Sequence, residues 1–209
     1  MIKNIILDLA GVVLNLNLER DTKALNDIGL PDFDECLRRQ ELRIPLLDYL
    51  NGLTSEHDFL NHIRPFCSQS STNNDILDAM DAVLDDIPES RLQLIISLRK
   101  DYRVFLLSNI YEKAWQYAVE RIEEQNHTVE ECFEKAFLSY EMMMAKPDPR
   151  IFHAVIEATG IIPEETLFLD DTRSNVDAAN SLGFNAVLVE MNKLEDCLSD
   201  VKQKLLIKQ

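Results

Sequence analysis

The sequence predicts an α/β fold, a doubly wound parallel sheet of five strands with a small α-helical cap inserted after the first strand. Short apolar runs alternate along the chain with segments of helical periodicity. Four of the five runs are nearly continuous in apolar residues, which is typical of parallel strands covered on both faces. Strands that alternate with helices indicate a parallel α/β sheet. One long stretch without a strand predicts the cap.

The predicted strands are Asn4 to Leu9, Arg103 to Leu107, Ala136 to Ser139, Thr166 to Leu169, and Ala186 to Val189. Three helices are predicted between the later strands, at Pro88 to Lys100, Arg150 to Thr159, and Ser174 to Leu182. The second and third are followed by Gly160 and Gly183, and glycine is the residue that most often ends a helix.

The stretch from Asn15 to Asp86 contains several helical segments and no convincing strand. One helix opens with the capping pattern Ser55-x-x-Asp58, and the polar run from Ser68 to Asn74 is expected to be a loop. We therefore expect an α/β core made of residues 1–14 and 88–209, and a helical cap made of residues 15–87.

Charge and composition narrow the possible partners and the cellular location. The 209 residues carry a formal net charge of −16, which repels nucleic acid and anionic membranes. The apolar run at the N-terminus is broken by Asp8 and precedes no cleavage site, so neither a signal peptide nor a membrane span is expected. The four cysteines form neither a zinc pattern nor a disulfide framework, which favours reduced thiols in the cytoplasm. No pattern in the chain specifies an oligomeric state.

Carboxylates follow two of the predicted strands. Asp8 follows the first, and Asp170-Asp171 follows the fourth, at the carboxyl edge where open α/β sheets bind ligands. Two adjacent carboxylates repel each other and favour a bound cation, and Mg²⁺ prefers such oxygen ligands. The alternatives are a turn or cap role for Asp8 and capping of the helix from Ser174 by the pair.

Two further polar groups lie near predicted strand ends. Ser108-Asn109 follows the second strand and has donors for phosphate oxygens, with capping of a helix from Tyr111 onward as the alternative. Lys146 precedes Pro147, and its ammonium group is suited to neutralising phosphate in an acidic protein, although a simple surface lysine is the alternative. Both groups are therefore candidates for binding phosphate oxygens.

Asp8, Ser108, Lys146 and Asp170-Asp171 occur in the order of the four motifs of the haloacid dehalogenase-like (HAD) hydrolase superfamily, which the chain resembles from about Met1 to Val189. The helical insertion resembles the C1 type of cap in that superfamily. The stretches YLNGLTSEHDFL and KPDPRIF also look like this family. Within it, the chain is most similar to bacterial sugar-phosphate phosphatases of the α-D-glucose 1-phosphate type.

The resemblance implies a role for each motif residue. Asp8 would be the nucleophile that forms an aspartyl-phosphate intermediate. Ser108 and Asn109 would hold the transferred phosphoryl group, and Lys146 would offset its negative charge. The superfamily's strand order, 5-4-1-2-3, would place Asp8 on the central strand.

The resemblance also implies a Mg²⁺ site. Asp8, Asp171 and the backbone carbonyl of Ala10 would bind the ion, aided by Asp170 or Asn175 directly or through a water molecule. Mg²⁺ would then screen the approach of the carboxylate to the anionic phosphate.

Ala10 departs from the pattern. Most phosphatases of the superfamily have a second aspartate there, which acts as general acid and base, and such catalysis contributes about 10² to 10⁴ in rate. Three interpretations remain open: a slower phosphatase suited to good leaving groups, another residue that supplies the proton, or a phosphate-ligand binder that has lost catalysis.

A haloacid dehalogenase is a further alternative, since that branch of the superfamily also lacks the second aspartate. It needs no Mg²⁺ and does not keep the acidic pair, so Asp170-Asp171 favours a phosphatase. The function that the sequence predicts is a Mg²⁺-dependent phosphatase of a small phosphorylated metabolite, a sugar phosphate in particular. The alternatives are a catalytically weak regulator that binds a phosphorylated ligand, and the dehalogenase.

Overall fold

A parallel sheet forms the centre of the molecule in the computed structural model, which describes residues 1–199. Its strands follow the order β3-β2-β1-β4-β5, which confirms the predicted order. Each expected strand is present, with its ends within two residues of the prediction. The strands are β1 (Asn4–Leu7), β2 (Arg103–Ser108), β3 (Lys135–Leu138), β4 (Thr166–Asp170) and β5 (Asn185–Leu188).

The first strand ends earlier than predicted because the chain turns sharply after Asp8. The backbone N–H groups of Val12, Val13 and Leu14 all donate to the carbonyl of Leu9. Leu9 therefore begins a tight loop, Leu9–Leu14, and does not continue the sheet.

Alternate residues of each central strand enter two different hydrophobic clusters. In β1, Ile5 and Leu7 belong to one cluster and Ile6 to the other. In β4, Phe168 meets the edge of Phe152 with ring centroids 5.6 Å apart, while its neighbours Leu167 and Leu169 face the opposite side. Burial on both faces explains why the strands have nearly continuous apolar sequences.

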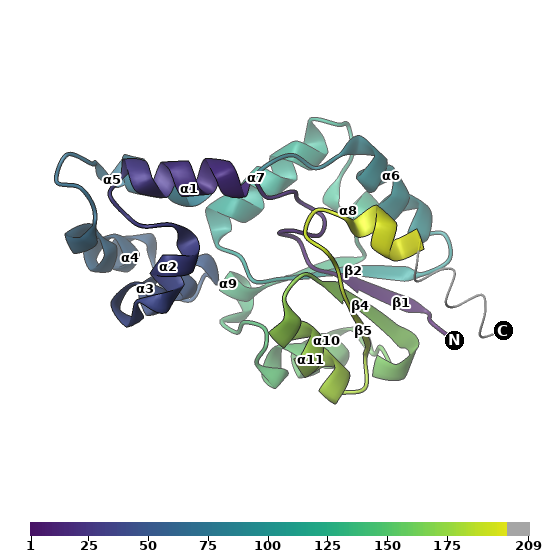
Figure 1. Ribbon diagram of the computed structural model, residues 1–209. Coiled ribbons are helices and arrows are strands. Elements are labelled where there is room, and N and C mark those ends of the chain that lie inside the picture. The colour runs from purple at the N-terminus through teal and green to yellow at the C-terminus, as the bar shows by residue number, and fades with distance from the viewer. Residues whose placement is uncertain (200–209) are drawn as a thin grey trace.

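Helices cover both faces of this sheet (Figure 1). Beside the sheet lie α6 (Glu89–Leu98), α7 (Glu112–Glu123), α8 (Val129–Cys132), α9 (Ser139–Met142), α10 (Pro149–Thr159) and α11 (Arg173–Ser181). Three of them, α6, α10 and α11, are the predicted helices. Gly160 ends α10 in the left-handed conformation with φ 68°, as the sequence indicated. A further helical stretch covers residues 194–199.

Residues 15–87 form a helical segment beside the sheet. It contains α1 (Leu18–Asp27), α2 (Phe33–Arg38), α3 (Gln40–Leu50), α4 (Glu56–Ile63), the short 3₁₀ helix η1 (Arg64–Phe66) and α5 (Asn73–Asp81). The hydroxyl of Ser55 accepts a bond from the N–H of Asp58 at the start of α4, as its capping pattern predicted. The segment lies at the end of the molecule toward which the strands run, so it faces the carboxyl edge of the sheet (Figure 1).

Two linkers join the helical segment to the rest of the chain, and they pair with each other. The N–H of Asn15 donates to the carbonyl of Asp86, and the N–H of Asn17 donates to that of Val83. Leu16 and Leu84 form an antiparallel bridge between these bonds. The segment therefore leaves and rejoins the core through a two-stranded ribbon.

Side-chain contacts also hold the helical segment against the sheet. The hydroxyl of Tyr111, which follows β2, donates to Asp81 at 2.6 Å, and its ring stacks on Tyr49 with centroids 4.7 Å apart. The hydroxyl of Ser139 donates to the carbonyl of Asn51 at 2.5 Å. These contacts join α3 and α5 to the residues that follow β2 and β3.

Gly52 lies at a close approach between the helical segment and the rest of the chain. Its φ is +68°, and a Cβ atom there would lie 2.2 Å from Cβ of Tyr140 and 2.7 Å from the carbonyl oxygen of Ile110. Both atoms belong to the core, so only a residue without a side chain fits this interface.

We expect Gly52→Ala to lower the free energy of unfolding by about 2–4 kcal/mol, since left-handed strain and overpacking both contribute. Gly160→Ala is the matched control, because Gly160 has the same φ and a Cβ atom there would meet no other atom within 4 Å. The control should lose only about 1–2 kcal/mol from backbone strain. Urea denaturation measures the free energy of unfolding of both variants. Equal losses would show that the interface accommodates the added methyl group without loss of stability.

Candidate active site

The sheet register places polar residues from the ends of three strands at one edge of the sheet. Leu7 pairs with Leu169 on one side and with Leu106 on the other. Asp8 therefore lies beside Asp170, and Ser108 ends the neighbouring strand. The predicted convergence of these side chains follows from parallel pairing of strands that are far apart in sequence.

Three carboxylates gather at this edge. Asp8, Asp170 and Asp171 each offer an oxygen atom, and these atoms lie within 4.8 Å of one another. Burial, together with the charges of Asp170 and Asp171, raises the pKa of Asp8 from 3.8 to about 7. Burial and the charge of Asp170 also raise the pKa of Asp171. The cluster is thus a buried concentration of negative charge, which favours a cation.

Lys146 supplies one cation to the cluster. Its side chain is fully buried, and its Nζ atom lies 2.9 Å from Asp8 and 2.7 Å from Asp170. Nζ also donates to the carbonyl of Leu107 at 2.8 Å, so all three of its protons have acceptors. Burial alone would lower the pKa of Lys146, but the carboxylates of Asp170 and Asp8 outweigh it and the pKa is raised. Lys146 therefore stays charged between the two strands.

Asn109 holds the backbone of Lys146. Its Oδ1 accepts from the N–H of Lys146, and its Nδ2 donates to the carbonyl of the same residue, both at 2.8 Å. The resemblance implied that Asn109 binds the phosphoryl group, whereas its side chain is bonded to Lys146. The side chain of Asn109 thus positions the lysine.

Asp170 is held by several donors. Asn175 donates to both of its oxygen atoms at 3.0 and 3.1 Å, and the N–H of Thr172 donates to one of them at 2.8 Å. Because Lys146 occupies the same carboxylate, Asp170 is heavily committed to protein partners. Asp171 accepts the weaker bond of Thr172 Oγ1 at 3.2 Å, so Asp171 is the more available ligand for a metal ion.

Ser108 contributes a hydroxyl that has no protein partner. The residue is fully buried, and its Oγ is among the buried side-chain atoms of residues 1–199 that lack a hydrogen bond. Leaving a buried hydroxyl unpaired costs about 1–3 kcal/mol. Such an atom at the same sheet edge as the carboxylates is suited to a ligand oxygen.

The loop Leu9–Leu14 brings backbone rather than side chains to the site. Gly11 has φ +76°, and a Cβ atom there would lie 2.1 Å from Oδ2 of Asp171. The main chain at Gly11, next to Ala10, therefore approaches Asp171 so closely that a side chain does not fit between them. Gly11 was not singled out from the sequence, although a glycine shortly after a candidate catalytic aspartate is a usable signal of close backbone approach.

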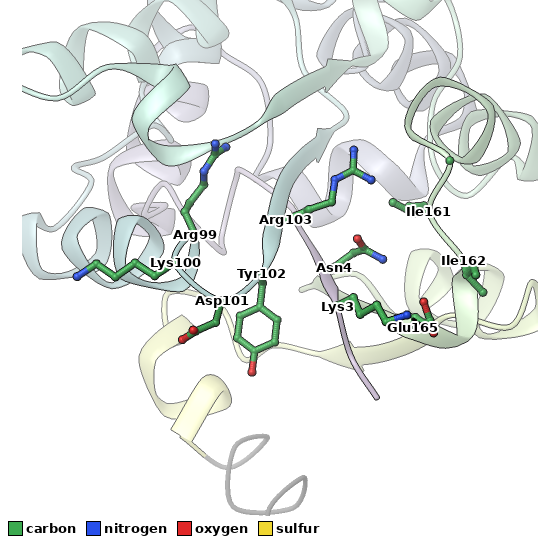
Figure 2. A pocket seen from close by; sticks show the side chains of 11 residues that line it. Lys3, Asn4, Arg99, Lys100, Asp101, Tyr102, Arg103, Ile161, Ile162 and Glu165 are labelled. Carbon is green, nitrogen blue, oxygen red and sulfur yellow. Dashed lines mark hydrogen bonds and ion pairs between the residues drawn. The ribbon is translucent and has the colours of Figure 1, made fainter.

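A cavity of about 450 Å³ lies at the opposite, amino edge of the sheet (Figure 2). Lys3, Asn4, Arg103 and Glu165 line it at the starts of strands. Two of its basic side chains form ion pairs, since Lys3 pairs with Glu165 at 2.8 Å and Arg103 with Glu134 at 2.6 Å. No helix within residues 1–199 combines the length and apolar character needed to cross a membrane.

The chain belongs to the haloacid dehalogenase-like hydrolase family, whose model matches residues 2–183. This membership confirms the resemblance drawn from the sequence, and it makes the protein a hydrolase.

Its relatives include phosphatases. D-ribitol-5-phosphate phosphatase of Bacteroides thetaiotaomicron is 31% identical over 186 residues, which are 88% of this chain and 90% of that protein. A HAD family enzyme of the same organism, solved in complex with magnesium and inorganic phosphate, has a TM-score of 0.81 and 36% identity, covering 92% of this chain and 96% of its own. A predicted HAD-like family hydrolase from Porphyromonas gingivalis has a TM-score of 0.84 and 32% identity over 98% of both chains.

We expect Lys146→Met to lower the free energy of unfolding by about 3–5 kcal/mol, because it leaves buried carboxylates without their cation. Lys23→Met is the control, since Lys23 pairs with Asp27 on the surface and should contribute little. Urea denaturation of the metal-free proteins gives both values. Equal stability of the two variants would mean that the carboxylates are not charged in the folded protein.

Proposed function

We propose that this protein is a Mg²⁺-dependent phosphatase of a small phosphorylated metabolite, a sugar phosphate in particular, which acts through an aspartyl-phosphate on Asp8. The observation that carries the proposal is the group formed by the buried Asp8 and Lys146 and the half-buried Asp171, at the same sheet edge as the unpaired hydroxyl of Ser108. The activity named for D-ribitol-5-phosphate phosphatase supports the substrate class.

The residues present fit a magnesium ion. Carboxylate oxygens are the ligands that Mg²⁺ prefers, and the three carboxylates are close enough to share one ion. Asp8, Asp171 and the carbonyl of Ala10 would hold it, while Asp170 and Asn175 would support the site directly or through water. When bound, Mg²⁺ supplies positive charge that offsets the repulsion between the carboxylates and the phosphate.

Asp8 carries the covalent chemistry. One of its carboxylate oxygens attacks phosphorus, and the bond from phosphorus to the substrate oxygen breaks, so the substrate oxygen leaves as an alkoxide that takes a proton from water to become the alcohol. Water then attacks phosphorus, which releases inorganic phosphate and restores the carboxylate. Lys146 and Ser108 would stabilise the charge on the phosphoryl oxygens, and such positioning and charge stabilisation provide most of the rate in phosphoryl transfer.

Residues 15–87 would act as a cap over this site. The segment faces the carboxyl edge of the sheet, contacts the residues that follow β2 and β3, and connects through a paired ribbon. A cap in this position excludes water and selects the organic part of the substrate. Cys36, Cys67 and Cys132 are free thiols, which suits a reducing compartment, and we place the enzyme in the cytoplasm.

A phosphate-release assay over sugar phosphates, with Mg²⁺ and with EDTA, tests the proposal. Release should require Mg²⁺, and Asp8→Asn should reduce it to below about one thousandth of the wild-type rate. Circular dichroism of Asp8→Asn controls for folding. Tight binding of a phosphorylated ligand without turnover would contradict the phosphatase assignment and favour a regulator. Halide release from 2-haloacids in the absence of metal would contradict the phosphatase assignment and favour a dehalogenase.

The alanine at position 10 has no proton to donate to the oxygen atom of the leaving group. We therefore expect Ala10→Asp to raise kcat by about 10²-fold or more on substrates with poor leaving groups. On an activated ester such as an aryl phosphate, kcat should change less. The ratio of the two kcat values is the measurement. An unchanged ratio would show that another residue already supplies the proton.

A further inference from the structure

Asn192 joins two segments that are distant from it in sequence. Its side chain pairs with the backbone of Leu16 in the first linker, accepting from the N–H and donating to the carbonyl, both at 2.9 Å. Its own backbone N–H donates to the carbonyl of Gly11 at 2.7 Å. A single residue in the turn after β5 thus contacts both the loop beside Asp8 and the first linker.

The backbone of Asn192 is shaped for this contact. It has φ +64°, the left-handed conformation that asparagine adopts more readily than most residues. The neighbouring Met191 also lies at the site, since its Cγ is 3.5 Å from a Cβ built on Gly11. The turn after β5 therefore packs directly on the Ala10–Gly11 region.

Arg91, near the start of α6, bonds to the same region, where the turn after β5 meets the loop Leu9–Leu14 and the first linker. Its guanidinium is almost fully buried and makes a bond with each of its N–H donors. Two bonds go to Glu195 at 2.8 and 3.0 Å, and one goes to the carbonyl of Asn192 at 3.0 Å. The other two, on Nη1, reach the carbonyl of Val13 at 3.1 Å and Oδ1 of Asn15 at 2.7 Å.

These bonds form one connected network. It begins at Gly11, beside the carbonyl of Ala10, and passes through Asn192 to Leu16. Asn15 extends it to the second linker, since its Nδ2 donates to Asp86 at 2.9 Å. The loop Leu9–Leu14 and both linkers of the helical segment are thus held by a common set of polar groups.

We propose that Asn192 and Arg91 are positioning residues that fix the Ala10–Gly11 backbone against the linkers of the helical segment. They thereby couple the Mg²⁺ site to the placement of that segment. The inference rests on the proposed function for the role of the Ala10 carbonyl. Neither residue contacts the reacting atoms; both act through the loop that follows Asp8.

Asn192→Gly tests the proposal with the least disturbance. Glycine keeps the left-handed backbone and the N–H bond to Gly11, and it removes only the two side-chain bonds to Leu16. Asn126→Gly is the matched control, because Asn126 has φ 60° and lies after α7, away from the site.

The first readout is amide hydrogen exchange in the metal-free protein. Loss of a purely local bond would speed exchange at Leu16 alone. A coupled network should also speed exchange at Gly11 and Asp85, whose N–H groups donate to Leu14 and Asn15 rather than to Asn192. The control should leave these amides unchanged.

The second readout is Mg²⁺ affinity, measured by calorimetry with the metal alone. We expect Asn192→Gly to weaken it about tenfold, as is common when groups that orient metal ligands are removed. Wild-type affinity together with unchanged exchange at Gly11 and Asp85 would overturn the proposal.

Two further results keep the inference separate from the proposed function. If Asn192→Gly does not fold, Asn192→Asp replaces it, since it keeps the acceptor for the N–H of Leu16 and loses only the donor to its carbonyl. It should show the same changes at a smaller size. If the wild type binds Mg²⁺ but hydrolyses no phosphate ester, the proposed function fails while the two readouts still decide the coupling.

Discussion

The repulsion between carboxylates at the end of β1 and β4 is the constraint on which this site depends. Parallel pairing forces Asp8 and Asp170 into adjacent positions, and burial removes the water that would screen them. The ammonium group of Lys146, which comes after β3 in the chain, pairs with both carboxylates. The side chain of Asn109 holds the backbone of Lys146 in place. One lysine cannot balance three carboxylates, so the arrangement that costs folding stability also favours a bound cation.

Much of the fold was predictable because its signals are local. Continuous apolar runs identified the strands, and the glycines that end α10 and α11 marked helix boundaries. The convergence of Asp8, Ser108, Lys146 and Asp170-Asp171 was also expected, since parallel strands end at one edge. Their roles in binding metal and phosphate remain predictions.

Other features depend on contacts between distant segments, for which one sequence has no local signal. The role of Asn109 in holding the phosphoryl group stays a prediction, and the bonds from its amide to Lys146, 37 residues away, had no signal in the sequence. Asn192 and Arg91 were not anticipated, because an asparagine in a turn and an arginine on a helix are usually surface residues. Their meeting point with Gly11 exists only in the folded sheet, in which β4 pairs with β1 on one side and with β5 on the other.

The pairing of Asn15 with Asp86 and of Asn17 with Val83 places the two ends of the insertion, residues 15–87, side by side. An insertion whose ends are adjacent adds nothing to the span that the sheet must bridge, so the sheet can form with the insertion altered or exchanged. Under the proposed function, exchange of this unit would change which organic group the site accepts. The strands and their carboxylates would stay the same, and one chemistry could serve many substrates.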